Sequence, residues 1–138
     1  MRVVLDTNIL IGALIIKGTP PDSLYQAWLR GEIELVTSTA QIRELADVLA
    51  RKRLQRFLDA DEAAAIVENI GTRAVILNEL PSVSHSPDPM DNQILATAIA
   101  GGVDLIVSGD KKHMLVLREV DGIPIVAARE ALELLRQG

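Results

Sequence analysis

Four acidic residues stand where folding would bring their side chains together. Asp6 and Asp110 each end a short apolar run, while Asp91 lies in the first turn of one expected helix and Glu44 in the early turns of another. Carboxylates that come close repel one another, and the repulsion is tolerable only if protons or cations neutralise them. These residues therefore predict a site that binds a cation.

The donor atoms available for such a cation are oxygens. The sequence contains no cysteine and two histidines, so a zinc site of the usual kind lacks its ligands. Carboxylate oxygens suit Mg²⁺ or Mn²⁺. A metal held in this way, with open positions for water and a phosphate oxygen, polarises the phosphate and generates hydroxide. Hydrolysis of a phosphodiester bond is the reaction that this chemistry favours.

Short apolar runs alternate along the chain with segments of helical periodicity. Nearly continuous apolar runs predict parallel strands that helices cover on both faces. We expect an α/β fold of three layers, α/β/α, with a central parallel sheet of four to five strands, and Pro124 places the last strand at a sheet edge. Ser38 with Gln41 resembles a capping box at the start of a helix. The expected strands are residues 3–5, 33–36, 74–77, 104–107 and 123–126.

This order of elements explains why the acids should meet. In open α/β sheets, ligands bind outside the carboxyl ends of the strands. Asp6 and Asp110 end the first and fourth expected strands, and Asp91 begins the helix that leads into the fourth. Glu44 follows the second strand and so faces the same end, although taken alone it also fits a solvated helix position. The sequence thus predicts one cleft lined by all four carboxylates.

Length and composition limit the alternatives. A chain of 138 residues, 49% of them hydrophobic, has the size and apolar content of one folded unit, so we expect residues 1–138 to form a single domain. An acid at position 6 comes too early for a secretory signal, and no apolar run can cross a bilayer, which predicts a cytoplasmic protein. The net charge of −5 argues against a protein that grips nucleic acid by charge alone.

Several polar residues near the acids allow more than one interpretation. Asp88 is the expected N-cap of the helix that begins at the next proline, and Asp91 in its first turn fits the helix dipole as well as a catalytic role. Thr7 and Asn8 can cap the helix that follows them or hold the preceding aspartate by hydrogen bonds. Ser108 can orient the acid two residues later or only shape a turn.

Six basic residues are candidates for contact with a nucleic acid. Four of them continue the helix that carries Glu44, where they can bind phosphates, bind an acidic partner or lie on a solvated helix face. The other two follow the fourth strand. Tyr25 and Trp28 are expected in the core or in a groove for a partner, so recognition of a nucleic acid should rely on its backbone and shape rather than on base stacking. The six are Arg51, Lys52, Arg53, Arg56, Lys111 and Lys112.

Four motifs occur in a distinctive order along the chain. They are Val3-Val4-Leu5-Asp6-Thr7-Asn8, Glu44, Ser86-Pro87-Asp88-Pro89-Met90-Asp91-Asn92 and Val107-Ser108-Gly109-Asp110. Together they resemble the PIN-domain family over essentially the whole chain, and within it the VapC-like toxin ribonucleases of prokaryotic toxin–antitoxin pairs. At Met90 this branch more usually has a second acid.

The resemblance carries specific expectations. It implies an endoribonuclease that depends on Mg²⁺ or Mn²⁺, forms a homodimer and is silenced by a cognate antitoxin protein. It also implies that the four acids are the catalytic, metal-binding quartet, with Thr7, Asn8 and Ser108 as supports. Such a protein acts on RNA as its substrate.

Other functional classes fit the sequence less well. An aspartyl-phosphate phosphatase or receiver domain needs a second acid where Asn8 stands, and a nucleotide-binding α/β domain needs a glycine-rich loop after its first strand. A housekeeping PIN nuclease in RNA processing and a nuclease acting on DNA remain alternatives. So does a catalytically silent PIN-like module that binds RNA or protein, although the intact quartet argues against it.

Overall fold

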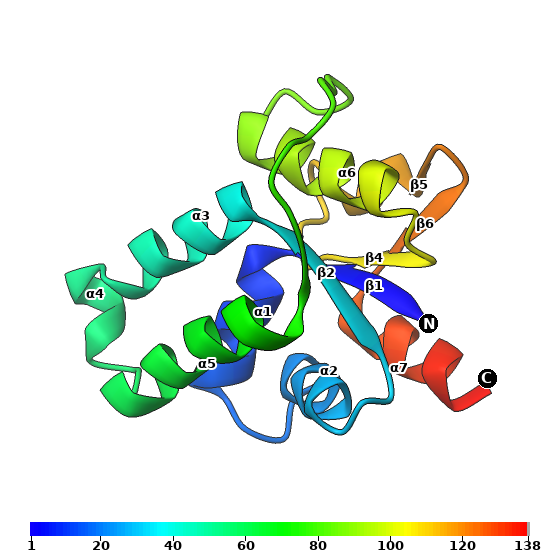
Figure 1. The fold of residues 1–138 in the computed structure, drawn as a ribbon. Coiled ribbons are helices and arrows are strands. Elements are labelled where there is room, and N and C mark those ends of the chain that lie inside the picture. The colour runs from blue at the N-terminus through cyan, green and yellow to red at the C-terminus, as the bar shows by residue number, and fades with distance from the viewer. Residues whose placement is uncertain (138) are drawn as a thin grey trace.

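The computed structural model describes residues 1–137, which fold around a six-stranded sheet (Figure 1). The strands are β1 (Arg2–Leu5), β2 (Glu34–Ser38), β3 (Val75–Leu77), β4 (Leu105–Val107), β5 (Glu119–Val120) and β6 (Ile123–Val126). Their order in the sheet is β3-β2-β1-β4-β6-β5, and all neighbours are parallel except β5 and β6. Because β2 and β4 flank β1 on opposite sides, the chain changes direction there and a crevice can open at the carboxyl ends of these strands.

Helices lie on both sides of this sheet, as Figure 1 shows. They are α1 (Thr7–Ile15), α2 (Pro20–Leu29), α3 (Thr39–Leu49), α4 (Lys52–Gln55), α5 (Ala60–Arg73), α6 (Pro89–Gly101), the 3₁₀ turn η1 (Leu115–Leu117) and α7 (Ala128–Gln137). The three-layer α/β/α architecture with a mostly parallel sheet is therefore confirmed. Within residues 1–137, none of the helices has the length and apolar character needed to span a bilayer.

The strand side chains feed two hydrophobic clusters, one on each face of the sheet. Val3 and Leu5 belong to the larger cluster, which also takes residues from α1, α2, α3, α5 and α7, whereas Val4 belongs to the cluster under α6. This alternation follows from the two-residue period of a strand, and it explains the continuous apolar run before Asp6. Both sides of β1 are thus buried up to the residue where the acid stands.

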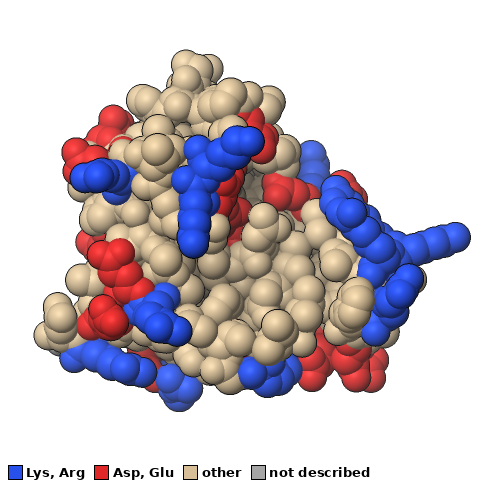
Figure 2. Space-filling model, turned by 180° about the vertical axis from the view of Figure 1, so that it is seen from behind, with Lys and Arg blue, Asp and Glu red and all other residues tan. Residues whose placement is uncertain are grey.

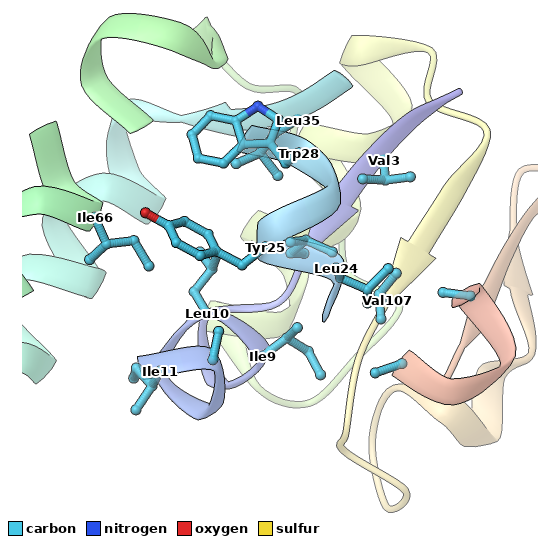
Figure 3. Close-up of a cluster of buried hydrophobic side chains, with 14 of the residues drawn as sticks. Val3, Ile9, Leu10, Ile11, Leu24, Tyr25, Trp28, Leu35, Ile66 and Val107 are labelled. Carbon is cyan, nitrogen blue, oxygen red and sulfur yellow. The ribbon is translucent and has the colours of Figure 1, made fainter. Parts of the chain in front are cut away.

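The two large aromatic residues of α2 lie in the larger cluster (Figure 3). Tyr25 is 8% exposed and Trp28 is 4% exposed, and their ring centroids are 5.8 Å apart. Of the two positions expected for them, the structure shows the core.

A hairpin adds one strand more than the sequence pattern predicts. β5 is two residues long and pairs antiparallel with β6 through a turn at Asp121 and Gly122, whose φ angles of 48° and 80° are those of a type I′ turn. The sheet therefore has six strands rather than four or five, and β6 is not its edge strand as Pro124 suggested. Pairing of β6 with β4 begins at Ile125, so Pro124, which has no N–H, precedes the residues paired with β4.

The helix that carries Glu44 is shorter than expected. α3 ends at Leu49, Arg51 is extended with φ −67° and ψ 132°, and the single turn α4 starts afresh after it. The prediction that residues 51–56 continue this helix is therefore wrong. Leu49 is the last buried residue of the α3 apolar face, and residues 50–53 are all exposed, so the core offers nothing that would extend the helix.

Candidate functional site

A cleft of about 730 Å³ lies at the carboxyl ends of the parallel strands. Asp6 reaches it from the end of β1, Asp110 from the loop after β4, Asp91 from the first turn of α6 and Glu44 from α3. Figure 2 shows acidic side chains inside a hollow of the surface and basic side chains beside it. The structure thus brings the four predicted acids into one cleft, which Asn8 and Asp88 also line.

Asp6 is held at the junction of β1 and α1. Its N–H donates to the Val107 carbonyl at 2.9 Å, which ties it to β4, and its own carbonyl accepts from the Ile9 N–H at 2.9 Å, which starts α1. Ser108 donates its hydroxyl to the Asp6 carboxylate at 2.8 Å. With 7% of its surface exposed, Asp6 is a buried acid whose direction is fixed on both sides.

Ser108 also links this acid to Asp110. The buried Ser108 hydroxyl accepts from the Asp110 N–H at 3.1 Å, so one side chain contacts the Asp6 carboxylate and the Asp110 backbone. The Asp110 carboxylate accepts from the backbone N–H groups of Lys112 and His113, each at 3.0 Å. These bonds leave the second carboxylate oxygen of Asp110 for the cleft.

Asp91 has its own serine support. Ser86 donates its hydroxyl to the Asp91 carboxylate at 3.2 Å. Asn92 holds Ser86 by two bonds, because its amide accepts from the Ser86 N–H at 2.9 Å and donates to the Ser86 carbonyl at 2.8 Å. Asp88 is the N-cap of α6, as expected, since its carboxylate accepts from the Met90 N–H at 2.9 Å.

The electrostatics of the cleft disfavour the charged carboxylates. Burial raises the pKa of Asp6, Glu44 and Asp91 above the usual range of carboxyl groups, and repulsion between neighbouring acids adds to each shift. The Ser108 and Ser86 hydroxyls oppose the shifts at Asp6 and Asp91, and the Thr7 hydroxyl opposes the shift at Glu44. Among residues 1–137, the ion pairs between side chains involve none of these acids.

Two buried polar residues, Thr7 and Gln41, lie next to the cleft without lining it. Thr7 is 2% exposed and its side chain lies beside Glu44 rather than in the open cleft. Gln41, also 2% exposed, donates to the Leu5 carbonyl just before Asp6. The predicted capping box is formed only in part, because Ser38 caps the Gln41 N–H at 3.1 Å while the Gln41 side chain reaches β1 instead of the cap.

The six predicted basic residues divide into two groups. Arg51 and Arg53 line the cleft, and Arg43 of α3 joins them. The other four are exposed and do not line it. These four are Lys52, Arg56, Lys111 and Lys112.

Sequence reasoning missed three residues of the site. Ser86 lies within a motif that pointed to Asp91, but nothing in the pattern showed that its hydroxyl would face that acid. Gln41 was interpreted only as a cap, although an amide on the same helix face as Leu45 and Leu49 is an unusual choice for a buried position. Arg43 gave no signal, because an arginine beside a glutamate on a helix is common on any surface.

The cleft matches a hard divalent cation in its donors. All of its candidate ligands are carboxylate oxygens. Burial and, to a smaller extent, repulsion raise the pKa values of Asp6, Glu44 and Asp91, and a bound cation would relieve that repulsion. As their side chains stand, no three His, Cys, Asp or Glu residues in the range 1–137 are gathered closely enough to hold a metal ion. The chemistry of the donor set fits Mg²⁺ or Mn²⁺, and the side chains would have to close around the ion.

Comparison with protein-family models gives a match. A family model described as "PIN domain" matches residues 2–112, which include all four acids and every strand up to β4. A search of curated proteins found no match to this sequence.

Proposed function

The chain belongs to the PIN-domain family, and from this premise we propose that it is an endoribonuclease that hydrolyses RNA phosphodiester bonds with Mg²⁺ or Mn²⁺. Members of this family are generally metal-dependent nucleases. RNA as the substrate and Mg²⁺ or Mn²⁺ as the ion are the finer parts of the proposal.

One observation carries the proposal. Asp6, Glu44 and Asp91 lie in one cleft with raised pKa values, and no side chain among residues 1–137 forms an ion pair with them. A protein that needed these positions only for folding would be more stable with neutral residues there, because buried like charges are costly. Acids kept at such a cost support a catalytic role, since shifted pKa values concentrate at functional sites.

In this mechanism the four acids would hold the metal ion. Bound there, it would polarise the phosphate and lower the pKa of a water molecule. Ser108 links the Asp6 carboxylate to the Asp110 backbone, and Ser86 directs Asp91 into the cleft. Asn8 lines the cleft with a side chain that can bind substrate, while Asp88 fixes the start of α6.

Basic residues at the cleft margin are proposed to bind the RNA backbone. Arg51 and Arg53 line the same cleft as the acids, and Arg43 adds a third guanidinium group, so phosphates beside the scissile one would meet them. Lys52, Arg56, Lys111 and Lys112 lie outside the cleft and would act only through their general field.

The test is RNA cleavage under three metal conditions. Structured and unstructured RNA are incubated with the protein in Mg²⁺, in Mn²⁺ and in EDTA, beside the Asp91→Asn variant. We expect cleavage in either metal, none in EDTA and none with the variant. Cleavage that persists in EDTA, or with Asp91→Asn, would contradict the proposed site.

We further propose that this nuclease is a homodimeric, cytoplasmic toxin silenced by an antitoxin. The order of its motifs supports this, because it resembles that of VapC-like toxins. Expression of the wild-type chain should then arrest growth, and expression of Asp6→Asn should not. Light scattering tests the dimer. Normal growth with active wild-type enzyme would favour a housekeeping role in RNA processing instead.

A further inference from the structure

We propose that Gln41 is a positioning residue for the metal site, which sets Asp6 and Glu44 through hydrogen bonds to Leu5 and Thr7. The inference rests on the proposed function and extends it to a residue outside the cleft. Gln41 is not among the residues that line the cleft, so it acts only through others.

The bonds of Gln41 join three elements of the site. Its Nε2 donates to the Leu5 carbonyl of β1 at 2.6 Å and to the Thr7 hydroxyl of α1 at 3.5 Å. Its Oε1 accepts from the Thr37 hydroxyl of β2 at 2.6 Å. The Leu5 carbonyl belongs to the peptide that precedes Asp6, so this contact fixes the backbone from which the buried acid projects.

The direction of each bond follows from the groups involved. The Leu5 carbonyl can only accept, so the amide nitrogen of Gln41 must face it, and the oxygen must then face Thr37. A hydroxyl has one proton. Because the Thr7 oxygen accepts from Gln41, its proton is free to point at Glu44, whose charged form the Thr7 hydroxyl favours. The amide thereby leaves the Thr7 proton available to Glu44.

Helix formation alone does not require this side chain. In the helix cap, the Gln41 backbone N–H donates to the Ser38 hydroxyl, and the side-chain amide of Gln41 takes no part. One and two turns later the same face of α3 carries Leu45 and Leu49, which are buried. Burying an amide costs free energy unless all its polar atoms form hydrogen bonds. A leucine at this position would fill the same space without that cost. The polar choice supports a role in placing the acids.

The experiment is a double-mutant cycle on Mn²⁺ affinity. Calorimetry gives the dissociation constant for wild type, Gln41→Met, Glu44→Gln and the double variant, and melting without metal checks that each is folded. We expect Gln41→Met to weaken Mn²⁺ binding about 10- to 100-fold, as removal of a hydrogen bond that orients a metal ligand does. In the Glu44→Gln background the same change should cost clearly less, because part of its effect acts through Glu44.

Asn69 of α5 provides a matched control. Its amide donates to the Tyr25 hydroxyl at 3.1 Å, and it does not line the cleft. Asn69→Leu should lower the melting temperature and leave Mn²⁺ affinity unchanged. Equal affinity in folded Gln41→Met, or purely additive effects in the cycle, would overturn the inference alone. No Mn²⁺ binding by wild type would overturn the proposed function and this inference with it.

A second variant covers the case in which Gln41→Met does not fold. Thr37→Val removes the hydroxyl that fixes the Gln41 oxygen and keeps both amide donors. We expect a smaller loss of Mn²⁺ affinity, again reduced in the Glu44→Gln background. Wild-type affinity in folded Thr37→Val would overturn the inference.

Discussion

The acids at the two ends of the parallel strands have opposite surroundings. We call the side of the sheet where these strands begin its amino edge and the side where they end its carboxyl edge. At the amino edge, Arg2 serves two acids: its backbone N–H donates to Asp104 at 2.8 Å, and its guanidinium pairs with Glu34 at 3.1 Å, where water also reaches them. At the carboxyl edge, Asp6 and Asp91 are each 7% exposed and take their side-chain bonds from serines.

The difference separates orientation from neutralisation. A serine hydroxyl or a backbone N–H fixes the direction of a carboxylate, but it brings no full positive charge, whereas an arginine brings both. At the amino edge, Glu34 therefore has a positive partner within the chain, and Asp104 is exposed to water. The carboxyl edge is oriented and left acidic, which is the state expected of a site that receives its cation from outside.

Replacing one acid at each edge should have the largest effect. We expect Asp6→Asn to lower RNA cleavage by more than about 100-fold, because in the proposed mechanism it removes a carboxylate that would hold the metal ion. Its melting temperature without metal should stay equal or rise, since repulsion is relieved. Asp104→Asn should cleave like wild type. Cleavage assays and thermal melts on both variants check this, and comparable activity in the two would remove the distinction between the edges.

Paired charge changes around the cleft should have a medium effect. Arg51→Gln with Arg53→Gln should raise KM for RNA about tenfold and flatten its salt dependence by about one counterion for each phosphate that is no longer neutralised, while kcat at saturating RNA survives. Lys52→Gln with Arg56→Gln removes the same charge outside the cleft and should change KM much less. Steady-state kinetics at several salt concentrations compare the two. Equal effects would mean that only the overall field matters.

The pH dependence of stability should show the smallest effect. The folded-state pKa of Asp6 is raised above its unfolded value, so the folded chain binds more protons between the two values and its free energy of unfolding falls as pH rises through that window. The loss is about 1.4 kcal/mol for each unit by which the pKa is raised. Denaturant melts without metal, from pH 4 to pH 8, should show a smaller decline in Asp6→Asn. An identical decline would mean that Asp6 ionises normally.

The sequence predicted the strands that precede candidate site residues better than it predicted the outer strands of the sheet. Asp6 and Asp110 followed strands that are buried on both faces, and such strands leave a strong continuous apolar signal. β5, with two residues, is too short to leave a pattern, and the turn at Asp121 and Gly122 was its one available sign. Pro124 misled because the hairpin covers the strand that it occupies.

Within the site, the acids were predictable and their supports less so. Strand ends indicate where Asp6 and Asp110 lie, since position along a strand fixes them. The contacts of Gln41 with Leu5 and of Ser86 with Asp91 depend on side-chain direction across elements, which periodicity does not encode. Arg51 and Arg53 line the cleft whereas Lys52 does not, and this too depends on side-chain direction.

The Mn²⁺ affinity of wild type, Asp6→Asn and Asp104→Asn tests most directly whether the carboxyl edge binds a metal ion. Calorimetry in the absence of RNA separates this question from substrate binding and from catalysis. We predict that wild type and Asp104→Asn bind Mn²⁺ with similar affinity and that Asp6→Asn loses most of it. Failure of wild type to bind at millimolar Mn²⁺, or equal binding by Asp6→Asn, would contradict a metal site at this edge.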